Sequence, residues 1–169
     1  MNNHYRGSKI YIIGSVASGK TTMAKKLSDQ FNVSWYELDN VVHLRLPSGD
    51  VRKSPEERDF EFNKIIDSEK WIIEGVFRQC FKEGFNKADT IILLDTPLFK
   101  RKYRIAKRWI RQNLKLEKSN YIPTMKMLFS MYKWSSDFEK SKDNILQMLE
   151  SYEDKVIILK DNTDENSYL

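Results

Sequence analysis

One short stretch, residues 14–21, carries residue types whose order suits the binding of phosphate. It reads Gly-Ser-Val-Ala-Ser-Gly-Lys-Thr and lies between an apolar run and a helical pattern. A strand, a glycine loop and a helix in this order turn the helix N-terminus into an anion site. Gly14 and Gly19 allow close approach of the backbone, and Lys20 reaches the outer phosphates. The Thr21 hydroxyl suits a Mg²⁺ ligand, so we expect a loop that binds ATP with Mg²⁺.

Acidic residues at the ends of three apolar runs are the next candidates for chemistry. Glu74 and Asp95 each end such a run, and either of them could face Thr21 and hold Mg²⁺ through water. Asp39 ends a third run and is better placed for a substrate hydroxyl, which it would orient or deprotonate. The competing interpretation is that each acid only caps the helix or turn that follows it.

Four arginines share one helical face. Arg101, Arg104, Arg108 and Arg111 have the spacing i, i+3, i+7 and i+10, which confines them to a stripe of about 80° on a helix. The guanidinium fork binds phosphate bidentately, so this pattern favours a phosphate clamp over a solvated surface. The clamp need not use all four. The apolar residues of the same segment lie about 140° away and are expected to face the core: Phe99, Tyr103, Ala106, Ile110 and Leu114.

Strands that alternate with helices must position these residues. Apolar runs predict strands at residues 10–13, 33–39, 71–75, 89–95 and 156–159. Helical patterns cover residues 20–31, 54–68, 97–114 and 123–152, the last with a break near residues 135–137. The segment 40–53 is expected to be an irregular substrate flap. Parallel neighbours need crossover helices, so the fold class is α/β with a parallel sheet.

Composition limits the remaining choices. The chain has 169 residues, enough for one domain over residues 1–169, and a net charge of +5 that implies an anionic partner. No apolar run approaches the roughly 18 residues of a membrane span, and no secretory signal is present. The single cysteine, Cys80, excludes an internal disulfide. We therefore expect a cytoplasmic protein that has no membrane partner.

The chain resembles the adenylate-kinase-like group of P-loop kinases over nearly its whole length. Its closer resemblance is to the small P-loop proteins known as DNA topology modulation proteins of the FlaR type. The resemblance rests on residues 12–22, 36–39, 71–75 and 94–97 and on the arginine helix. It implies a five-stranded parallel sheet of order 2-3-1-4-5, helices on both faces, and a short helical lid within residues 97–135.

The resemblance also implies roles for individual residues. Residues 74–78, Glu-Gly-Val-Phe-Arg, look like the Asp-Gly-Phe-Pro-Arg element of nucleoside monophosphate kinases, in which the acid helps to order Mg²⁺ and the arginine grips the acceptor phosphate. Arg104 and Arg108 look like lid arginines, and residues 160–162, which include Asn162, look like the loop that borders the adenine. The residues expected to contact the nucleotide are Gly14, Ser15, Ala17, Ser18, Gly19, Lys20, Thr21, Thr22 and Asn162.

Two functions follow from these patterns. The first is an ATP-dependent kinase that moves the γ-phosphoryl group to a small acceptor, a nucleotide or related metabolite. Asp39 and Arg78 would face that acceptor. The second is a nucleic-acid-associated regulator, in which the basic helix binds a phosphate backbone and ATP acts as a switch. The sequence contains no helix-turn-helix, zinc-knuckle or RNA-recognition pattern in support of the second function.

Overall fold

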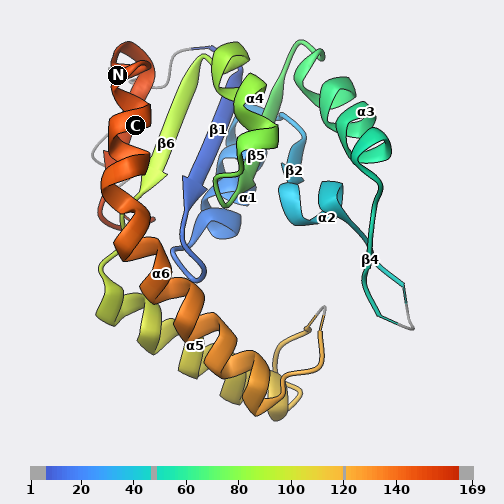
Figure 1. Cartoon of the computed structure of the whole chain (residues 1–169), viewed down its shortest axis with the longest axis vertical. Helices are drawn as coiled ribbons and strands as arrows, with labels where there is room; N and C mark the ends of the chain where they lie inside the picture. The colour runs from blue at the N-terminus through green and yellow to red at the C-terminus, as the bar shows by residue number, and fades with distance from the viewer. Residues whose placement is uncertain (1–6, 47–48, 120, 164–169) are drawn as a thin grey trace.

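A five-stranded parallel sheet forms the centre of the structure, a computed structural model that describes residues 7–46, 49–119 and 121–163 (Figure 1). Its strand order is β2-β5-β1-β6-β7, and every neighbouring pair is parallel. Numbered along the chain within this sheet, the order is 2-3-1-4-5, so the predicted topology is confirmed. The strands are β1 (Lys9–Gly14), β2 (Trp35–Glu37), β5 (Trp71–Gly75), β6 (Thr90–Leu94) and β7 (Val156–Leu159).

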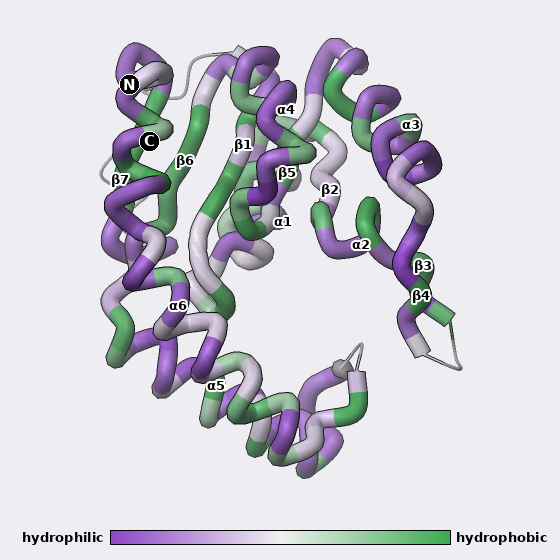
Figure 2. Tube along the Cα trace, viewed as in Figure 1, coloured by the Kyte–Doolittle hydropathy of each residue, from purple (hydrophilic) through white to green (hydrophobic). Residues whose placement is uncertain are grey.

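The central strand β1 is apolar on both sides because helices cover both faces of the sheet (Figure 2). Ile10 and Ile12 pack with Met23 and Leu27 of α1 (Lys20–Phe31) on one face. Tyr11 belongs to the core of the opposite face. That core is covered by α2 (Leu38–Val42), α3 (Pro55–Ile66), α4 (Lys82–Lys87) and the C-terminal part of α6 (Met125–Glu150).

The segment between β2 and α3 differs from the irregular flap that was predicted. This segment forms α2 and then a pair of antiparallel strands of two residues each, β3 (His43–Leu44) and β4 (Val51–Arg52). Asp39 therefore lies inside α2 and not at a strand end, because β2 already stops at Glu37. The start of α3 was predicted correctly, since Ser54 and Glu57 form a capping box and Pro55 is the first residue of the helix.

Two long helices extend beyond the carboxyl edge of the sheet (Figure 1). They are α5 (Leu98–Asn113) and α6, which pack side by side. The predicted break in α6 near residues 135–137 is wrong, because the helix runs through them without interruption. Short turns of helix, η1 (Gln79–Phe81) and η2 (Glu153–Lys155), complete the described elements. Among the described residues, no helix has the length and apolar character that crossing a bilayer requires.

Candidate active site

The phosphate-binding loop joins β1 to α1 and depends on its two glycines. A Cβ atom on Gly14 would lie 2.8 Å from the Leu94 carbonyl oxygen and 2.8 Å from the Ser18 hydroxyl. Gly19 has a φ of +101° and caps α1, and a Cβ there would lie 2.7 Å from Cγ of Asn162. Neither position accepts a larger residue without a shift of its surroundings. The loop is therefore a cradle that side chains would fill.

Two serine hydroxyls of this loop are buried without a partner. Ser15 and Ser18 are almost completely inaccessible, and neither Oγ atom has a hydrogen-bond partner among the described residues. Buried polar atoms are normally satisfied, so an orphaned pair in one loop indicates a place where a polar ligand completes the bonding. Ala17 holds a φ of +58°, a left-handed conformation that helps to curl the loop.

The Lys20 side chain lies buried under the loop. Its Nζ donates a hydrogen bond to the Ser15 carbonyl oxygen at 2.7 Å and so closes the loop onto its first residue. Burial lowers the pKa of the Lys20 ammonium, and the nearby Glu74 carboxylate offsets part of this effect. The ammonium thus lies at the base of the glycine cradle, where phosphate oxygens would bind.

Thr21 and Glu74 come together although 53 residues separate them. The pairing of β5 with β1, in which Glu74 lies opposite Ile12, brings the acid to the start of α1. The Thr21 Oγ1 donates a hydrogen bond to Glu74 Oε1 at 2.5 Å. Glu74 is 2% exposed, and burial raises its pKa, while the Lys20 charge and the Thr21 bond lower it by less. A hydroxyl beside a carboxylate is a donor set that suits Mg²⁺.

Asp95, the other predicted metal acid, lies on the opposite side of β1 and has different partners. It follows β6 and accepts hydrogen bonds from Lys142 at 2.7 Å and from Lys160 at 2.6 Å. Burial acts to raise the pKa of Asp95, but the two lysine contacts outweigh it and hold that pKa below its usual range. The structure therefore brings Glu74, and not Asp95, into contact with Thr21.

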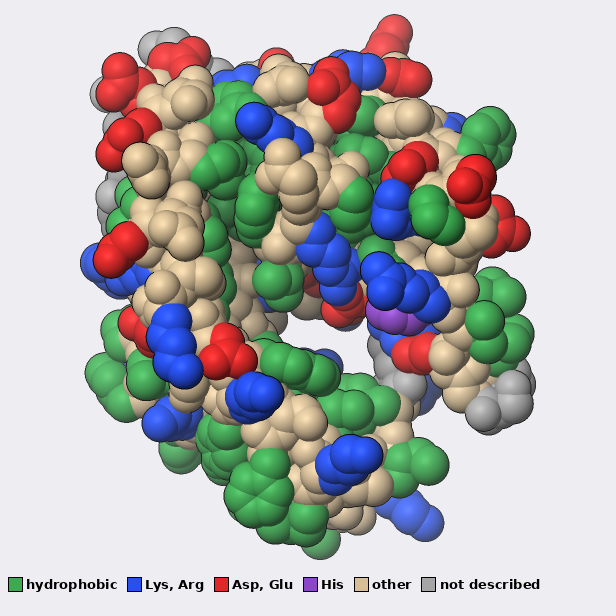
Figure 3. All heavy atoms as spheres, in the orientation of Figure 1, with side chains coloured by type: hydrophobic (Ala, Val, Ile, Leu, Met, Phe, Trp, Pro, Cys, Tyr) green, Lys and Arg blue, Asp and Glu red, His purple; other side chains and the backbone are tan. Residues whose placement is uncertain are grey.

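The predicted acceptor residues form an ion pair. The Arg78 Nη2 donates to Asp39 Oδ1 at 2.8 Å, which joins α2 to the segment after β5. Both side chains are partly exposed, and the Arg78 Nη1 is buried without a partner among the described residues. Figure 3 shows a hollow between this side of the molecule and the α5–α6 arm, with acidic and basic side chains gathered on its walls.

The structure separates the four arginines of α5. Arg101 is fully buried, where it donates to the Ser135 carbonyl oxygen at 3.1 Å, pairs with Glu139 and stacks over Phe138. Arg108 and Arg111 both lie 3.3–3.4 Å from Glu117. Because Arg101 is inaccessible, a nucleic-acid backbone cannot contact all four arginines.

Arg104 contacts the backbone of the phosphate loop. It donates to the Ser18 carbonyl oxygen at 3.0 Å, to Asp161 at 2.8 Å and to Asn162 at 3.1 Å. Thr96 donates to the same Ser18 oxygen at 3.0 Å. Arg104 therefore fixes the loop against the segment that follows β7.

Asp161 is a member of this site that the sequence analysis missed. It is buried and pairs with Arg104 and with Lys100, and these two contacts lower its pKa although burial opposes them. Its position two residues after a predicted strand was the signal that could have identified it, since a similar position at a strand end selected Glu74 and Asp95. Thr22 lies exposed in the first turn of α1, beside Thr21.

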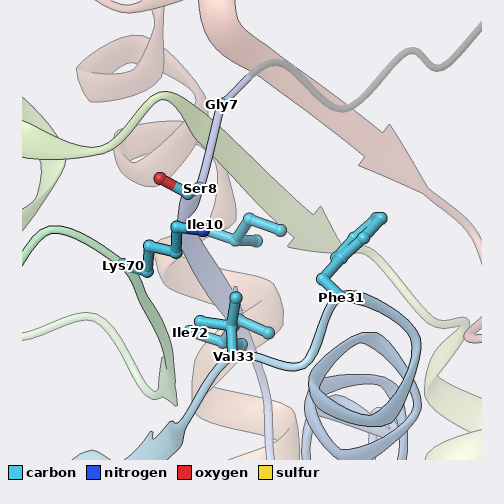
Figure 4. Close-up of a pocket in the computed structure, with 7 residues that line it drawn as sticks. All are labelled: Gly7, Ser8, Ile10, Phe31, Val33, Lys70 and Ile72. Atoms are coloured by element: carbon cyan, nitrogen blue, oxygen red, sulfur yellow. The ribbon is translucent and has the colours of Figure 1, made fainter.

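A second hollow lies at the opposite end of the sheet, away from the loop. In Figure 4 the side chains of Ile10, Phe31, Val33 and Ile72 turn toward one another at the amino ends of the strands. Its volume is about 100 Å³ and its walls are mostly apolar, so it lacks the room for a nucleotide. Within the described part of the chain, no group of three or more His, Cys, Asp or Glu side chains has the arrangement of a metal site.

Comparisons with known proteins give structural similarity only. No family model and no curated protein matches the chain. A shikimate kinase from Bacteroides thetaiotaomicron is 17% identical, with a TM-score of 0.47 and coverage of 90% of this chain and 86% of that one. A shikimate kinase from Acinetobacter baumannii is 15% identical, with a TM-score of 0.47, and the match covers 88% of this chain and 96% of that one.

A putative fructose transport system kinase from Silicibacter sp. TM1040 is similar as well. It is 14% identical, with a TM-score of 0.48, and the match covers 77% of this chain and 81% of that one. At these identities and TM-scores the similarities do not assign a substrate to this chain. The evidence for its chemistry comes from its own loop, sheet order and side chains.

Proposed function

We propose that this protein is an ATP-dependent phosphotransferase that moves the γ-phosphoryl group of Mg·ATP to a small acceptor, a nucleotide or related metabolite. The observation that carries the proposal is the contact between Thr21, in the first turn of α1 after the glycine loop, and Glu74. Phosphoryl transfer needs positioning, a metal ion and positive charge more than it needs covalent chemistry from the protein. In this proposal residues 1–169 form one kinase-like domain.

On the donor side, the loop residues hold the triphosphate. In this proposal the hydroxyls of Ser15 and Ser18, which have no partner among the described residues, and the backbone N–H groups of the loop donate hydrogen bonds to the phosphates. Lys20 supplies an ammonium at the outer phosphates. The full donor set in this proposal is Gly14, Ser15, Ala17, Ser18, Gly19, Lys20, Thr21, Thr22 and Asn162.

The residues present fit a magnesium ion. Mg²⁺ is usually held by one or two protein oxygens together with waters and substrate phosphates, and Thr21 with Glu74 provides such a pair. When bound, the ion neutralises charge on the phosphate oxygens. We assign the metal acid to Glu74, because Asp95 is already engaged by Lys142 and Lys160. Burial raises the pKa of Glu74, and a cation bound beside it would act in the opposite direction and favour its charged form.

On the acceptor side, Asp39 and Arg78 have complementary tasks. The acceptor oxygen forms a bond to the γ-phosphorus as the bond from that phosphorus to the ADP oxygen breaks. The acceptor hydroxyl loses its proton, and in this proposal Asp39 orients that hydroxyl and takes the proton. Arg78, with its unpartnered Nη1, would hold an anionic group of the acceptor.

Two arginines of α5, Arg104 and Arg108, have different roles in this proposal. Arg104 acts through the Ser18 carbonyl and Asn162, so it keeps the donor loop in shape. Arg108 is half exposed, and its long contact with Glu117 leaves it able to turn toward the phosphates. Both residues stay predicted contributors to catalysis.

Removal of the Lys20 ammonium tests the proposal. We expect Lys20→Ala to lower turnover by about 100-fold or more, because loss of a charge-stabilising donor acts on the transition state. The assay is ADP release from Mg·ATP in the presence of nucleosides, nucleoside monophosphates, small alcohols and oligonucleotide 5′ ends. The oligonucleotides also test the nucleic-acid link that the FlaR-type resemblance implies.

Lys64→Ala is the matched control, because Lys64 is an exposed lysine on α3. This variant should keep full activity, and circular dichroism should show that both variants are folded. Full turnover in folded Lys20→Ala would contradict the proposed mechanism.

A further inference from the structure

The outer face of α5 carries an exposed apolar stripe. Phe99, Tyr103, Ile110 and Leu114 are each between 51% and 69% exposed. Successive residues of a helix turn by about 100°, so these four side chains fall within an arc of roughly 60°. The stripe was predicted to face the core, and this prediction is wrong. Ile105, on the opposite side of the helix, packs with Leu128 and Met131 of α6 instead.

Basic side chains line both edges of this stripe. Helix α5 contains seven lysines and arginines and no acidic residue. Helical geometry places Lys102 along one edge and Lys107 with Arg111 along the other. Among the described residues, neither Lys102 nor Lys107 forms an ion pair. The alternation of hydrophilic and hydrophobic residues along α5 is visible in Figure 2.

The surface continues from α5 onto α6. An open groove of about 430 Å³ is lined by Lys102 of α5 and by Tyr132, Lys133 and Ser136 of α6. Phe129, one turn before Lys133 on α6, is 63% exposed. The basic side chain of Lys133 and the aromatic side chain of Phe129 therefore extend the edge that Lys102 begins.

We propose that this face of α5 binds the surface of an anionic phospholipid membrane, a partner that the sequence analysis, which considered only membrane-spanning segments, did not expect. A helix with an apolar stripe between two basic edges lies in the plane of the membrane interface, with the stripe among the acyl chains and the cations at the headgroups. Tyr103 and Phe99 are suited to that boundary, where aromatic rings are favoured. Helix α5 itself contains no acid. Arg111 pairs with Glu117, but Lys102 and Lys107 have no ion-pair partner among the described residues, and they make the outer face complementary to negative charge.

Charge also decides against two other occupants. In a dimer that joined the apolar stripes of two copies of the chain, the basic edges of one copy, with Lys102, Lys107 and Arg111, would lie against the basic edges of the other. Like charges in contact across an interface repel. A nucleic acid would need cations at the centre of the contact, where phosphates lie, but the centre of this face is apolar. An anionic lipid surface matches both parts of the face.

Membrane binding would leave the nucleotide loop open. Arg104, which contacts that loop, projects from α5 about 120° away from the centre of the stripe. The inference therefore does not depend on the phosphotransferase activity, and a vesicle assay tests it without any turnover measurement.

Vesicle sedimentation tests the proposal on the intact protein. We expect the protein to pellet with phosphatidylcholine vesicles that contain about one third phosphatidylglycerol, and at least about tenfold less with pure phosphatidylcholine. Raising the salt concentration should weaken the binding, since it screens the charges at the two basic edges. Failure to pellet with the anionic vesicles would overturn the proposal.

Paired variants separate the apolar and the basic contributions. Phe99→Ser with Ile110→Ser should reduce binding to anionic vesicles by about tenfold or more, because two exposed apolar side chains no longer enter the bilayer. Lys102→Glu with Lys107→Glu should have a similar effect through charge. The control is Phe60→Ser with Lys64→Glu on α3, which carries the same kinds of change at exposed positions and should bind as wild type.

Two results would assign the face to another partner and so overturn the proposal. One is a dimer in size-exclusion chromatography with light scattering that Phe99→Ser with Ile110→Ser dissociates. The other is tighter binding to a fluorescent oligonucleotide than to vesicles, lost in the Lys102→Glu and Lys107→Glu variant. Equal vesicle binding by the apolar variant and the wild type would also contradict it.

Discussion

The carboxyl edge of the sheet has two halves, on either side of β1, and they use acidic residues differently. On the β5 side, Glu74 contacts the Thr21 hydroxyl and has no lysine or arginine within salt-bridge distance among the described residues. On the β6 and β7 side, Asp95 and Asp161 are each held by two basic side chains. Burial raises the pKa of Glu74, whereas the basic partners lower the pKa of Asp95 and of Asp161.

This difference separates an acid prepared for a ligand from acids that hold the fold. A buried carboxylate with two cationic partners is already neutralised, so it joins elements together. A buried carboxylate with only a hydroxyl partner stays short of positive charge, and a metal ion can supply that charge. The position at a strand end is the same in both cases. The distant partners decide the role.

The largest effect that tests this contrast is expected at Glu74. Glu74→Gln should lower kcat/KM with Mg·ATP by about 10- to 100-fold, the range typical for a residue that supports a metal site. The measurement is ADP release over a series of Mg²⁺ concentrations, and the variant should need more Mg²⁺ for half-maximal rate. It should also unfold at the same or higher urea concentration, because a buried charge has been removed.

A double-mutant cycle with Thr21→Val sharpens this prediction. Thr21→Val removes the hydroxyl that contacts Glu74 and keeps the shape of the side chain. If the two groups act as one unit, the double variant should be no worse than about the poorer single variant. Effects on kcat/KM that multiply would show that Thr21 and Glu74 act separately.

Arg104 gives the next effect, on nucleotide binding. Arg104→Met should raise the KM for ATP by about tenfold, because the loop loses its tie to Asp161 and Asn162 and a small displacement weakens binding. The substitution keeps most of the side-chain volume. Arg111→Met is the matched control, since the ion-pair partner of Arg111 among the described residues is the partly exposed Glu117 and not a residue of the loop. A KM for Arg104→Met equal to that of the control would show that the tie is dispensable.

Asp95 should affect stability more than activity. Asp95→Asn weakens the hydrogen bonds from Lys142 and Lys160, at a cost of about 1–3 kcal/mol in unfolding free energy. Urea unfolding measures this, and kcat/KM should change by less than about threefold. A loss of activity that follows Mg²⁺ concentration, as for Glu74→Gln, would place Asp95 in the metal site and break the contrast.

The pH dependence of unfolding distinguishes the same two acids. The pKa of Asp95 is lowered in the folded protein, so its stabilising effect is present above the unfolded pKa and is lost as the pH falls through the folded one. The pKa of Glu74 is raised, so its charge costs stability once the pH rises above the unfolded pKa. Below neutral pH, the free energy of unfolding should fall less steeply with decreasing pH in Asp95→Asn than in the wild type, and Glu74→Gln should not show this change.

The sequence was sufficient for the sheet and for the loop because both depend on local patterns. Short apolar strands, a glycine cradle and helix caps are each visible within about ten residues, and they predicted a parallel sheet and the position of Lys20. The order of the strands was predicted only through the resemblance to P-loop kinases. The strand-end criterion also selected Glu74 and Asp95. It did not separate them, because Lys142 and Lys160 lie 47 and 65 residues away from Asp95.

The two helices of the arm show why the remaining predictions were wrong. Amphipathic spacing located both faces of α5, but its orientation is set by contacts that are distant in sequence, such as those of Arg101 with Ser135 and Glu139. In α6, Ser135 reads as a possible new helix start, yet it is buried in line with Leu128 and Phe138. Packing along that stripe keeps the helix continuous, because tertiary contacts override weak local preferences.

The smallest predicted effect concerns Ala17, on the donor side of the contrast. Its φ of +58° is left-handed, a conformation that costs a residue with a Cβ about 1–2 kcal/mol. Ala17→Gly removes this strain but gives the unfolded chain more freedom, so we expect a net gain in unfolding free energy below about 1 kcal/mol. Urea unfolding of Ala17→Gly beside Ala106→Gly, a helical alanine in α5, measures the difference, because the second change should destabilise. Destabilisation of equal size in both variants would show that the curl of the loop stores no strain at Ala17.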